Sequence, residues 1–103
     1  MARRSKDWNV GLADDLRDLD FAREFLLAAF DEGVSVQRAL SKVIRAMGVQ
    51  EFGALVRMAG PNVLRAIHPQ YNPTQETLNR LLRPFRLRLG LARIAQRRTR
   101  SAA

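Results

Sequence analysis

Hydrophobic residues recur along most of the chain at the three- and four-residue spacing of an amphipathic helix. The first such stretch places six apolar residues on one face: Phe21, Ala22, Phe25, Leu26, Ala29 and Phe30. Asp18 precedes them as the expected N-cap, and Gly33 follows as the expected left-handed stop. The pattern predicts a helix from about Leu19 to Glu32.

The second stretch is the most regular in the chain. Its buried face is expected to consist of Val36, Ala39, Leu40, Val43, Ile44 and Met47. Ser35 is the expected N-cap and Gly48 the expected stop, so a helix is predicted between them. Two shorter apolar segments follow, at residues 50–56 and 61–67. They are too short to be stable alone, and only packing against the longer helices can hold them.

A last helical segment begins near Pro73. Asn72 or Thr74 is expected to cap it, with Pro73 in its first turn. Its buried face is predicted to contain Leu78, Leu81, Leu82 and Phe85. Pro84 lacks a backbone N–H and disfavours helical angles at Arg83, so the helix is predicted to end there.

The hydrophobic pattern changes beyond this point. Phe85, Leu87, Leu89 and Leu91 alternate with polar or small residues, and a period of two is typical of a strand. A single strand has no partner inside a helical chain. We therefore expect it either to pair with a second subunit across a two-fold axis, which we favour, or to pack as an extended tail.

Length and composition limit the class of protein. The chain has 103 residues and no cysteine, which excludes a disulfide scaffold, a cysteine zinc site and a thiol nucleophile. No apolar run approaches the roughly 20 residues of a membrane span, and the N-terminus lacks the apolar core of a signal peptide. We expect a cytoplasmic protein without membrane or cofactor, in which residues 12–94 form one domain, 1–11 a flexible arm and 95–103 a disordered basic tail.

Charge is distributed unevenly along the chain. The net charge is +8, and residues 52–103 contain ten Arg against one acidic residue, Glu76. Such a basic half favours an anionic partner, which can be nucleic acid, an acidic protein or anionic lipid. Arg dominates over Lys, and its planar fork suits phosphate and guanine. A coding bias toward Arg would explain that ratio but not the asymmetry.

The two short segments have the spacing of a helix-turn-helix. From Phe52, apolar residues follow at offsets of four, six, eleven and fourteen: Val56, Met58, Val63 and Ala66. In this motif, two side chains of the first helix, one side chain of the turn and the inner face of the second helix point into the core. Gly53 lies beside Phe52, where a small residue lets the two helices cross closely. A bulky side chain there is expected to separate them.

The second helix of the motif starts abruptly at Gly60-Pro61, and it is expected to present Asn62 and Arg65 outward. Asn can bind adenine bidentately in the major groove, and Arg can bind guanine or phosphate. A phosphate can also be held by the amide of Gln50 at the start of the first helix, or by Arg57 in the turn. The candidate DNA-binding residues are Gln50, Arg57, Gly60, Asn62, Arg65 and His68.

The sequence contains few residues suited to metal binding or catalysis. His68 is the only histidine and has no second His or Cys beside it, so we expect it at a helix end or near a phosphate, with no metal site. Trp8 either packs onto the helices or anchors a partner. An acidic cluster is formed by Asp14, Asp15, Asp18 and Asp20. We expect it to be solvated or, alternatively, to contact a basic toxin. No nucleophile–base pair or phosphate loop is present, so neither catalytic residues nor an enzyme are predicted.

The order of these segments resembles that of the small helix-turn-helix antidote proteins (antitoxins) of bacterial addiction modules, relatives of the lambda-repressor-like (Xre-like) regulators. The likeness covers about Leu12 to Leu91 and is carried by "LADDLRDLDFAREFLLAAFDEG", "ALSKVIRAMG", "NVLRAI" and "NPTQETLNRLL" with its "LRLGL" end. It implies an all-α, five-helix lambda-repressor-like fold with a short C-terminal strand or extended segment. It also implies binding to double-stranded operator DNA as a homodimer, repression of the module's own promoter, and a small toxin partner.

The chain departs from this family pattern at two places. Arg57 stands where the turn usually carries Gly, so that the turn needs a left-handed Arg or another geometry. Residues 59–61, Ala-Gly-Pro, stand where a Ser cap and polar residues are usual. Two other functions remain open: a helix-turn-helix regulator without a toxin, and a basic module that binds an acidic protein or RNA.

Overall fold

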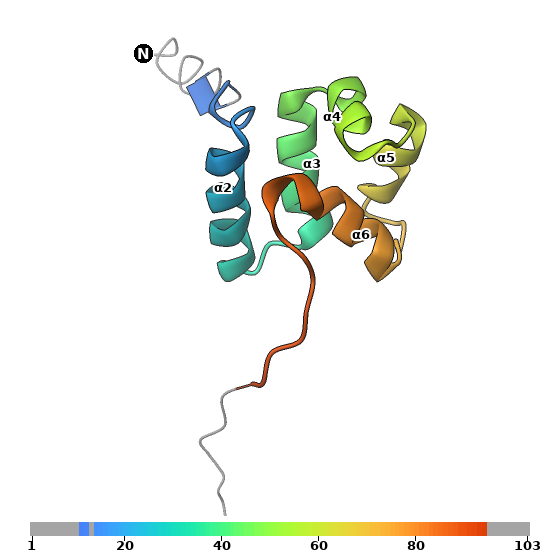
Figure 1. Ribbon diagram of the computed structural model, residues 1–103. Helices are drawn as coiled ribbons and strands as arrows, with labels where there is room; N and C mark the ends of the chain where they lie inside the picture. Colours follow the sequence, from blue (N-terminus) through green and yellow to red (C-terminus); the bar gives the residue numbers. More distant parts are fainter. Residues whose placement is uncertain (1–10, 13, 95–103) are drawn as a thin grey trace, which may run out of the picture.

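The computed structural model describes residues 11, 12 and 14–94 (Figure 1). This part of the chain is all-helical, with five α-helices and one 3-10 turn: α2 Leu19–Asp31, α3 Val36–Met47, α4 Val49–Val56, α5 Gly60–Ala66, α6 Gln75–Leu82 and η1 Arg83–Phe85. The predicted all-α class is confirmed for these residues. The predicted tail and Trp8 lie outside them, as does all of the predicted arm except Gly11. None of the helices in the described part is long and apolar enough to cross a bilayer.

The two longer helices begin and end where the sequence indicates. Asp18 caps α2 by accepting two backbone N–H groups at 2.8 and 3.2 Å, and Ser35 caps α3 by accepting one at 3.2 Å. Gly33 follows α2 with a φ of 87°, and Gly48 follows α3 with a φ of 102°. The caps satisfy backbone donors that a first turn leaves unpaired, and the glycines adopt angles that cost other residues energy.

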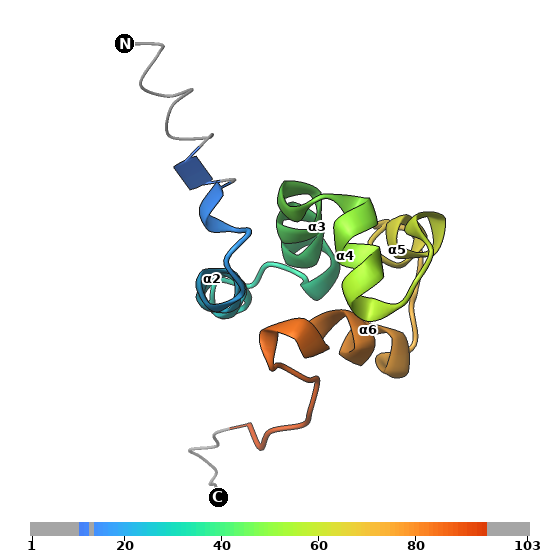
Figure 2. The ribbon, with the colours of Figure 1, turned by 45° about the horizontal axis from the view of Figure 1, so that its top comes forward.

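The helices surround one hydrophobic core. In both views α2 lies on one side of α3, and α4 with α5 lies on the other, while η1 contacts α2, α4 and α6 (Figures 1 and 2). Sixteen apolar residues are buried in it: Leu16, Ala22, Leu26, Ala39, Leu40, Val43, Ile44, Met47, Phe52, Val56, Val63, Ala66, Ile67, Leu81, Leu82 and Phe85.

One residue of the predicted core face of α2 is misplaced. Phe21 is 43% exposed, so its predicted place on the buried face is wrong. The core-facing side of α2 is defined by its two fully buried residues, Ala22 and Leu26. With about 100° of rotation per residue, Phe21 is turned roughly 120° from the centre of that side and is therefore exposed.

Two predictions about the prolines at the ends of α6 are wrong. Thr74 is the N-cap of α6 and accepts a backbone N–H at 3.1 Å, so Pro73 precedes the cap and is not in the first turn. The α-helix ends at Leu82 as predicted, but Arg83 keeps right-handed helical angles, with φ −56° and ψ −41°. The chain continues there as the 3-10 turn η1, in which Pro84 occupies an early position where no N–H is required.

The chain after η1 forms no strand among the described residues. Leu87 and Leu89 pack half-buried against the core, and the N–H of Leu89 donates to Oδ1 of Asn79 at 2.6 Å. Leu91 and Ile94 are 104% and 77% exposed, where the segment runs away from the helices (Figure 2). Within one chain this segment is an extended tail, and strand pairing with a second subunit stays a prediction.

A side chain at the start of α3 holds the loop after α5. The amide nitrogen of Gln37 lies within hydrogen-bond distance of the carbonyl oxygens of Ala66, His68 and Tyr71, at 3.0, 2.9 and 2.8 Å, so that its two N–H groups serve three acceptors. Gln37→Leu keeps the side-chain volume but removes the donor, so we expect the free energy of unfolding to fall by about 1–2 kcal/mol. Urea denaturation measures this loss. Gln75→Leu, exposed at the start of α6, should change stability by less than about 0.5 kcal/mol, and equal effects would contradict the role of Gln37.

Candidate nucleic-acid interface

The predicted site residues lie mainly on α4, α5 and the turn that joins them. α4 ends at Val56 and α5 begins at Gly60, with residues 57–59 between. α4 approaches the backbone of the turn closely at Gly53, where a Cβ atom would lie 2.5 Å from the carbonyl oxygen of Met58 and 3.8 Å from the side chain of Val63 of α5. The predicted need for a small residue at Gly53 is therefore confirmed.

The turn after α4 has a left-handed residue. Arg57 adopts φ 60° and ψ 48°, which is one of the two geometries that the absence of glycine left open. In this conformation the chain reverses, and the N–H of Met58 donates to the carbonyl oxygen of Gly53 at 2.9 Å. A non-glycine residue in this region costs roughly 1–2 kcal/mol, so other contacts must hold the turn.

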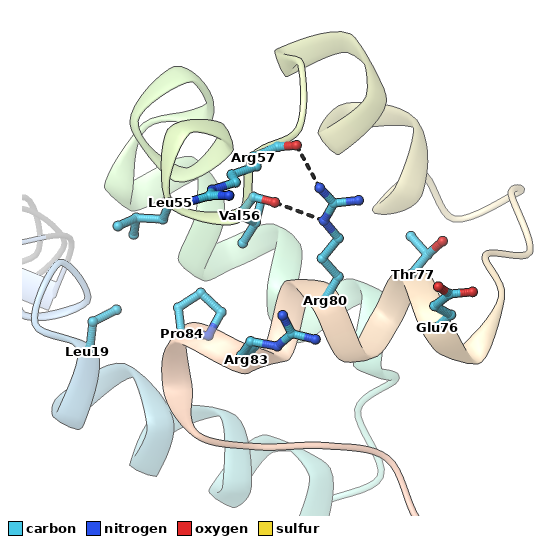
Figure 3. Close-up of a pocket in the computed structure, with 9 residues that line it drawn as sticks. All are labelled: Leu19, Leu55, Val56, Arg57, Glu76, Thr77, Arg80, Arg83 and Pro84. Carbon is cyan, nitrogen blue, oxygen red and sulfur yellow. Dashed lines mark hydrogen bonds between the residues drawn. The ribbon is translucent and has the colours of Figure 1, made fainter.

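Arg80 of α6 supplies those contacts (Figure 3). Its Nε donates to the carbonyl oxygen of Val56 at 2.9 Å, and its Nη2 donates to that of Arg57 at 2.8 Å. The guanidinium group thus binds two carbonyl oxygens at the C-terminal end of α4, where the helix dipole favours a cation. Arg80 was not among the predicted site residues, because nothing in the sequence around it indicates a contact with a turn 23 residues away.

Replacing Arg80 tests whether it stabilises the turn. Arg80→Met keeps a long apolar stem but removes both hydrogen bonds, so we expect a loss of about 1–2 kcal/mol in the free energy of unfolding. Urea denaturation gives the value, and Arg38→Met, which removes an exposed arginine from α3, is the control. A loss no greater than that of the control would show that Arg80 does not hold the turn.

The short helix α5 has two distinct faces. Val63 and Ala66 are 0% and 1% exposed and belong to the core. Asn62 and Arg65 are exposed, as is Leu64 between them in the sequence. The predicted burial of Val63, Ala66 and Ile67 and the predicted exposure of Asn62 and Arg65 are therefore confirmed.

The N-terminal ends of α4 and α5 lie side by side. Gln50 is exposed in the first turn of α4, and a Cβ atom added to Gly60 would lie 3.1 Å from its amide nitrogen. Gly60 itself is buried and does not face solvent. Its lack of a side chain leaves room for the side chain of Gln50. Neither helix has a side-chain hydrogen bond at its N-cap. The first N–H groups of α4 therefore have no side-chain acceptor, and such groups are suited to phosphate oxygens. The first turn of α5 offers no comparable set, because Pro61 lacks an N–H and the N–H of Asn62 donates to the carbonyl oxygen of Ala59 at 2.9 Å.

His68 is separated from these N-terminal groups. It follows the C-terminal end of α5, and its Nδ1 accepts the backbone N–H of Gln70 at 3.1 Å. The prediction of a helix-end position is confirmed. Because α5 runs from Gly60 to Ala66, His68 lies beyond the far end of the helix from Gln50, and the structure does not bring the two residues together.

A hollow between α5 and α6 is lined by three arginines. Arg57, Asn62 and Arg65 line it together with Tyr71 and Arg80, and no acidic residue is among the side chains that form it. Three guanidinium groups around one concave surface create a positive potential and offer donors that suit phosphate oxygens. The arrangement can bind an anion through side chains that come from both helices and from the turn.

The acidic cluster lies apart from this hollow. Asp14, Asp15, Asp18 and Asp20 are all exposed, which agrees with their predicted solvation. Asp18 caps α2, and the Asp20 carboxylate lies 3.4 Å from the guanidinium group of Arg23. A contact between this cluster and a basic toxin stays a prediction.

Comparison of the chain with protein-family models, curated proteins and solved structures gives no match.

Proposed function

We propose that the protein is a sequence-specific DNA-binding repressor, the antitoxin of a toxin–antitoxin module, and that it binds its own operator as a dimer. The observation that carries this proposal is the pair of faces on α5. Val63 and Ala66 are buried, while Asn62 and Arg65 line a hollow without acidic residues. A short helix fixed to the core that presents an amide and a guanidinium group outward is well suited to reading base edges.

In this proposal α4 and α5 form a lambda-repressor-like helix-turn-helix, and α5 enters the major groove. Arg65 binds O6 and N7 of guanine, and Asn62 binds N6 and N7 of adenine. Gln50 and Arg57 contact phosphates on the two flanks and fix the register of the protein on the duplex. Leu64, 39% exposed on α5, can contact the methyl group of thymine.

Homodimer formation is supported by the C-terminal segment. Leu91 and Ile94 expose apolar surface to water, and Leu87 and Leu89 are only half-buried. Two extended segments related by a two-fold axis can pair as antiparallel strands and bury these side chains. Such a dimer presents two copies of α5, and its operator is expected to be an inverted repeat.

The antitoxin role is supported by the resemblance to addiction-module antidotes. It predicts that the neighbouring reading frame encodes a small toxin. Expression of that frame alone should arrest growth, and co-expression of this chain should relieve the arrest. If the neighbouring frame has no effect on growth, the protein is better described as a regulator without a toxin.

DNA recognition is tested through Arg65. Arg65→Ala is expected to weaken binding to a duplex from the protein's own promoter by about tenfold, because a bidentate contact is worth roughly 1–3 kcal/mol. Arg38→Ala removes the same charge from the outer face of α3 and should weaken binding far less. Fluorescence anisotropy of the labelled duplex measures both. Equal losses, or no binding by the wild-type protein, would argue against sequence reading by α5.

A basic module that binds RNA or an acidic protein gives the opposite pattern. Its binding would survive Asn62→Ala and Arg65→Ala, and it would be lost when the residues after Ile94 are deleted.

A further inference from the structure

A second concave surface lies on the other side of the Arg57–Arg80 contact. This groove, about 740 Å³ in volume, runs between the C-terminal end of α4, helix α6 with η1, and the first residue of α2 (Figure 3). It shares Arg57 and Arg80 with the hollow beside α5. Asn62 and Arg65, the proposed base-reading residues, are not part of it. A ligand can thus occupy the groove without touching Asn62 or Arg65, although the groove shares Arg57, a proposed phosphate contact, with the proposed DNA surface.

One end of the groove is apolar. Leu19, Leu55 and Pro84 gather there from three different elements (Figure 3). Leu55 is 54% exposed, which is more than any other large hydrophobic residue within helices α2 to α6. An apolar surface that is concave and exposed is a typical docking site for a side chain of a partner.

The middle of the groove is cationic. Arg57 and Arg83 line it beside Arg80, and among residues 11, 12 and 14–94 neither Arg57 nor Arg83 forms an ion pair. Glu76 is the one acidic residue of the lining, and it lies at the end away from the apolar side chains (Figure 3). A bound segment therefore meets an apolar surface and, next to it, two arginines without acidic partners.

The charge of the chain argues against its own ends as occupants. Residues 1–10 contain three basic residues and one acidic residue, and residues 95–103 contain three arginines and no acidic residue. Both segments would place like charges beside Arg57 and Arg83. The complementary occupant is acidic.

We propose that this groove binds a short acidic segment of a partner protein, in which a large apolar side chain stands beside carboxylates. The apolar side chain packs against Leu19, Leu55 and Pro84. The carboxylates accept hydrogen bonds from Arg57 and Arg83, whose forked guanidinium groups bind carboxylate bidentately. The proposal goes beyond DNA binding and does not depend on it.

Selection of peptides from a random displayed library on the full-length wild-type protein provides the probe. Enriched peptides are expected to be acidic and to contain Leu, Ile or Phe. Their affinity should fall by about tenfold or more in Leu55→Ser/Arg83→Glu. Leu27→Ser/Arg38→Glu makes the same changes at exposed positions of α2 and α3, outside the groove, and should retain the affinity. Thermal melting of both variants verifies that they fold.

Several results would overturn the proposal. The peptide experiment contradicts it if no peptides are enriched, if the enriched peptides are neutral or basic, or if the two variants lose peptide affinity equally. Another contradicting result is conversion of a wild-type dimer to a monomer by Leu55→Ser/Arg83→Glu in sedimentation experiments, which would make the groove a subunit interface. A third is loss of duplex affinity in Arg83→Glu as large as in Arg65→Ala, which would make the groove a phosphate-binding surface. Failure of DNA binding alone would leave the peptide result unchanged.

Discussion

Replacing Phe85 with Ala is expected to lower the free energy of unfolding by about 3–5 kcal/mol. The Phe85 side chain is fully buried in η1 and stacks on Phe52 of α4, with ring centroids 5.9 Å apart and ring planes inclined by 16°. Because η1 contacts α2, α4 and α6, the cavity left by Ala would open at the junction of three helices. The loss is a large fraction of the roughly 5–15 kcal/mol that stabilises a typical domain.

Urea denaturation followed by circular dichroism measures this effect. Phe21→Ala is the matched control, because Phe21 is 43% exposed and its removal leaves no closed cavity. It should lower stability by about 1 kcal/mol or less. Similar losses in the two variants would mean that Phe85 does not close the core.

Gly53→Val is expected to destabilise the protein by about 3 kcal/mol. The Cβ atom of any larger residue would lie 2.5 Å from the carbonyl oxygen of Met58, which belongs to the backbone of the turn and cannot rotate away. Relief of this clash requires that α4 move away from the turn, which also disturbs its contact with Val63 of α5, 3.8 Å from the same Cβ position.

Gly90→Val is the control for this substitution. Nothing lies within 4 Å of a Cβ atom at Gly90, and its φ is not positive, so the change should alter stability by less than about 0.5 kcal/mol. Thermal and urea unfolding of both variants give the comparison. A Gly53→Val protein as stable as wild type would show that α4 and the turn are not closely packed.

The helices were predictable where local signals agree. In α3, six apolar residues at helical spacing lie between Ser35, which caps the helix, and Gly48, which has a positive φ. Capping and periodicity act within a few residues, so they can be recognised in the sequence without knowledge of the fold. The inner face of α5 and the close approach at Gly53 were likewise predictable from spacing.

The incorrect or missing predictions have a common cause, which is contact between distant segments. Pro84 was expected to remove Arg83 from helical angles, yet packing of Phe85 in the core continues the chain as a 3-10 turn. Alternation after η1 left a paired strand and an extended tail open, and the packing of Leu87 and Leu89 on the helices of the same chain has no signal in that alternation. The hydrogen bonds of Arg80 and Gln37 to distant carbonyl oxygens leave no local pattern in the sequence.

The most direct measurement of the proposed function is selection of bound duplexes from a random pool. Affinity for the selected duplex and for a scrambled one is then measured at two salt concentrations, with wild type and Asn62→Ala/Arg65→Ala. The proposal predicts an inverted repeat bound about a thousandfold or more tighter than the scrambled duplex, with the difference lost in the variant. Binding that weakens steeply with salt but ignores both sequence and substitution would contradict it, because the arginines would then hold only phosphates.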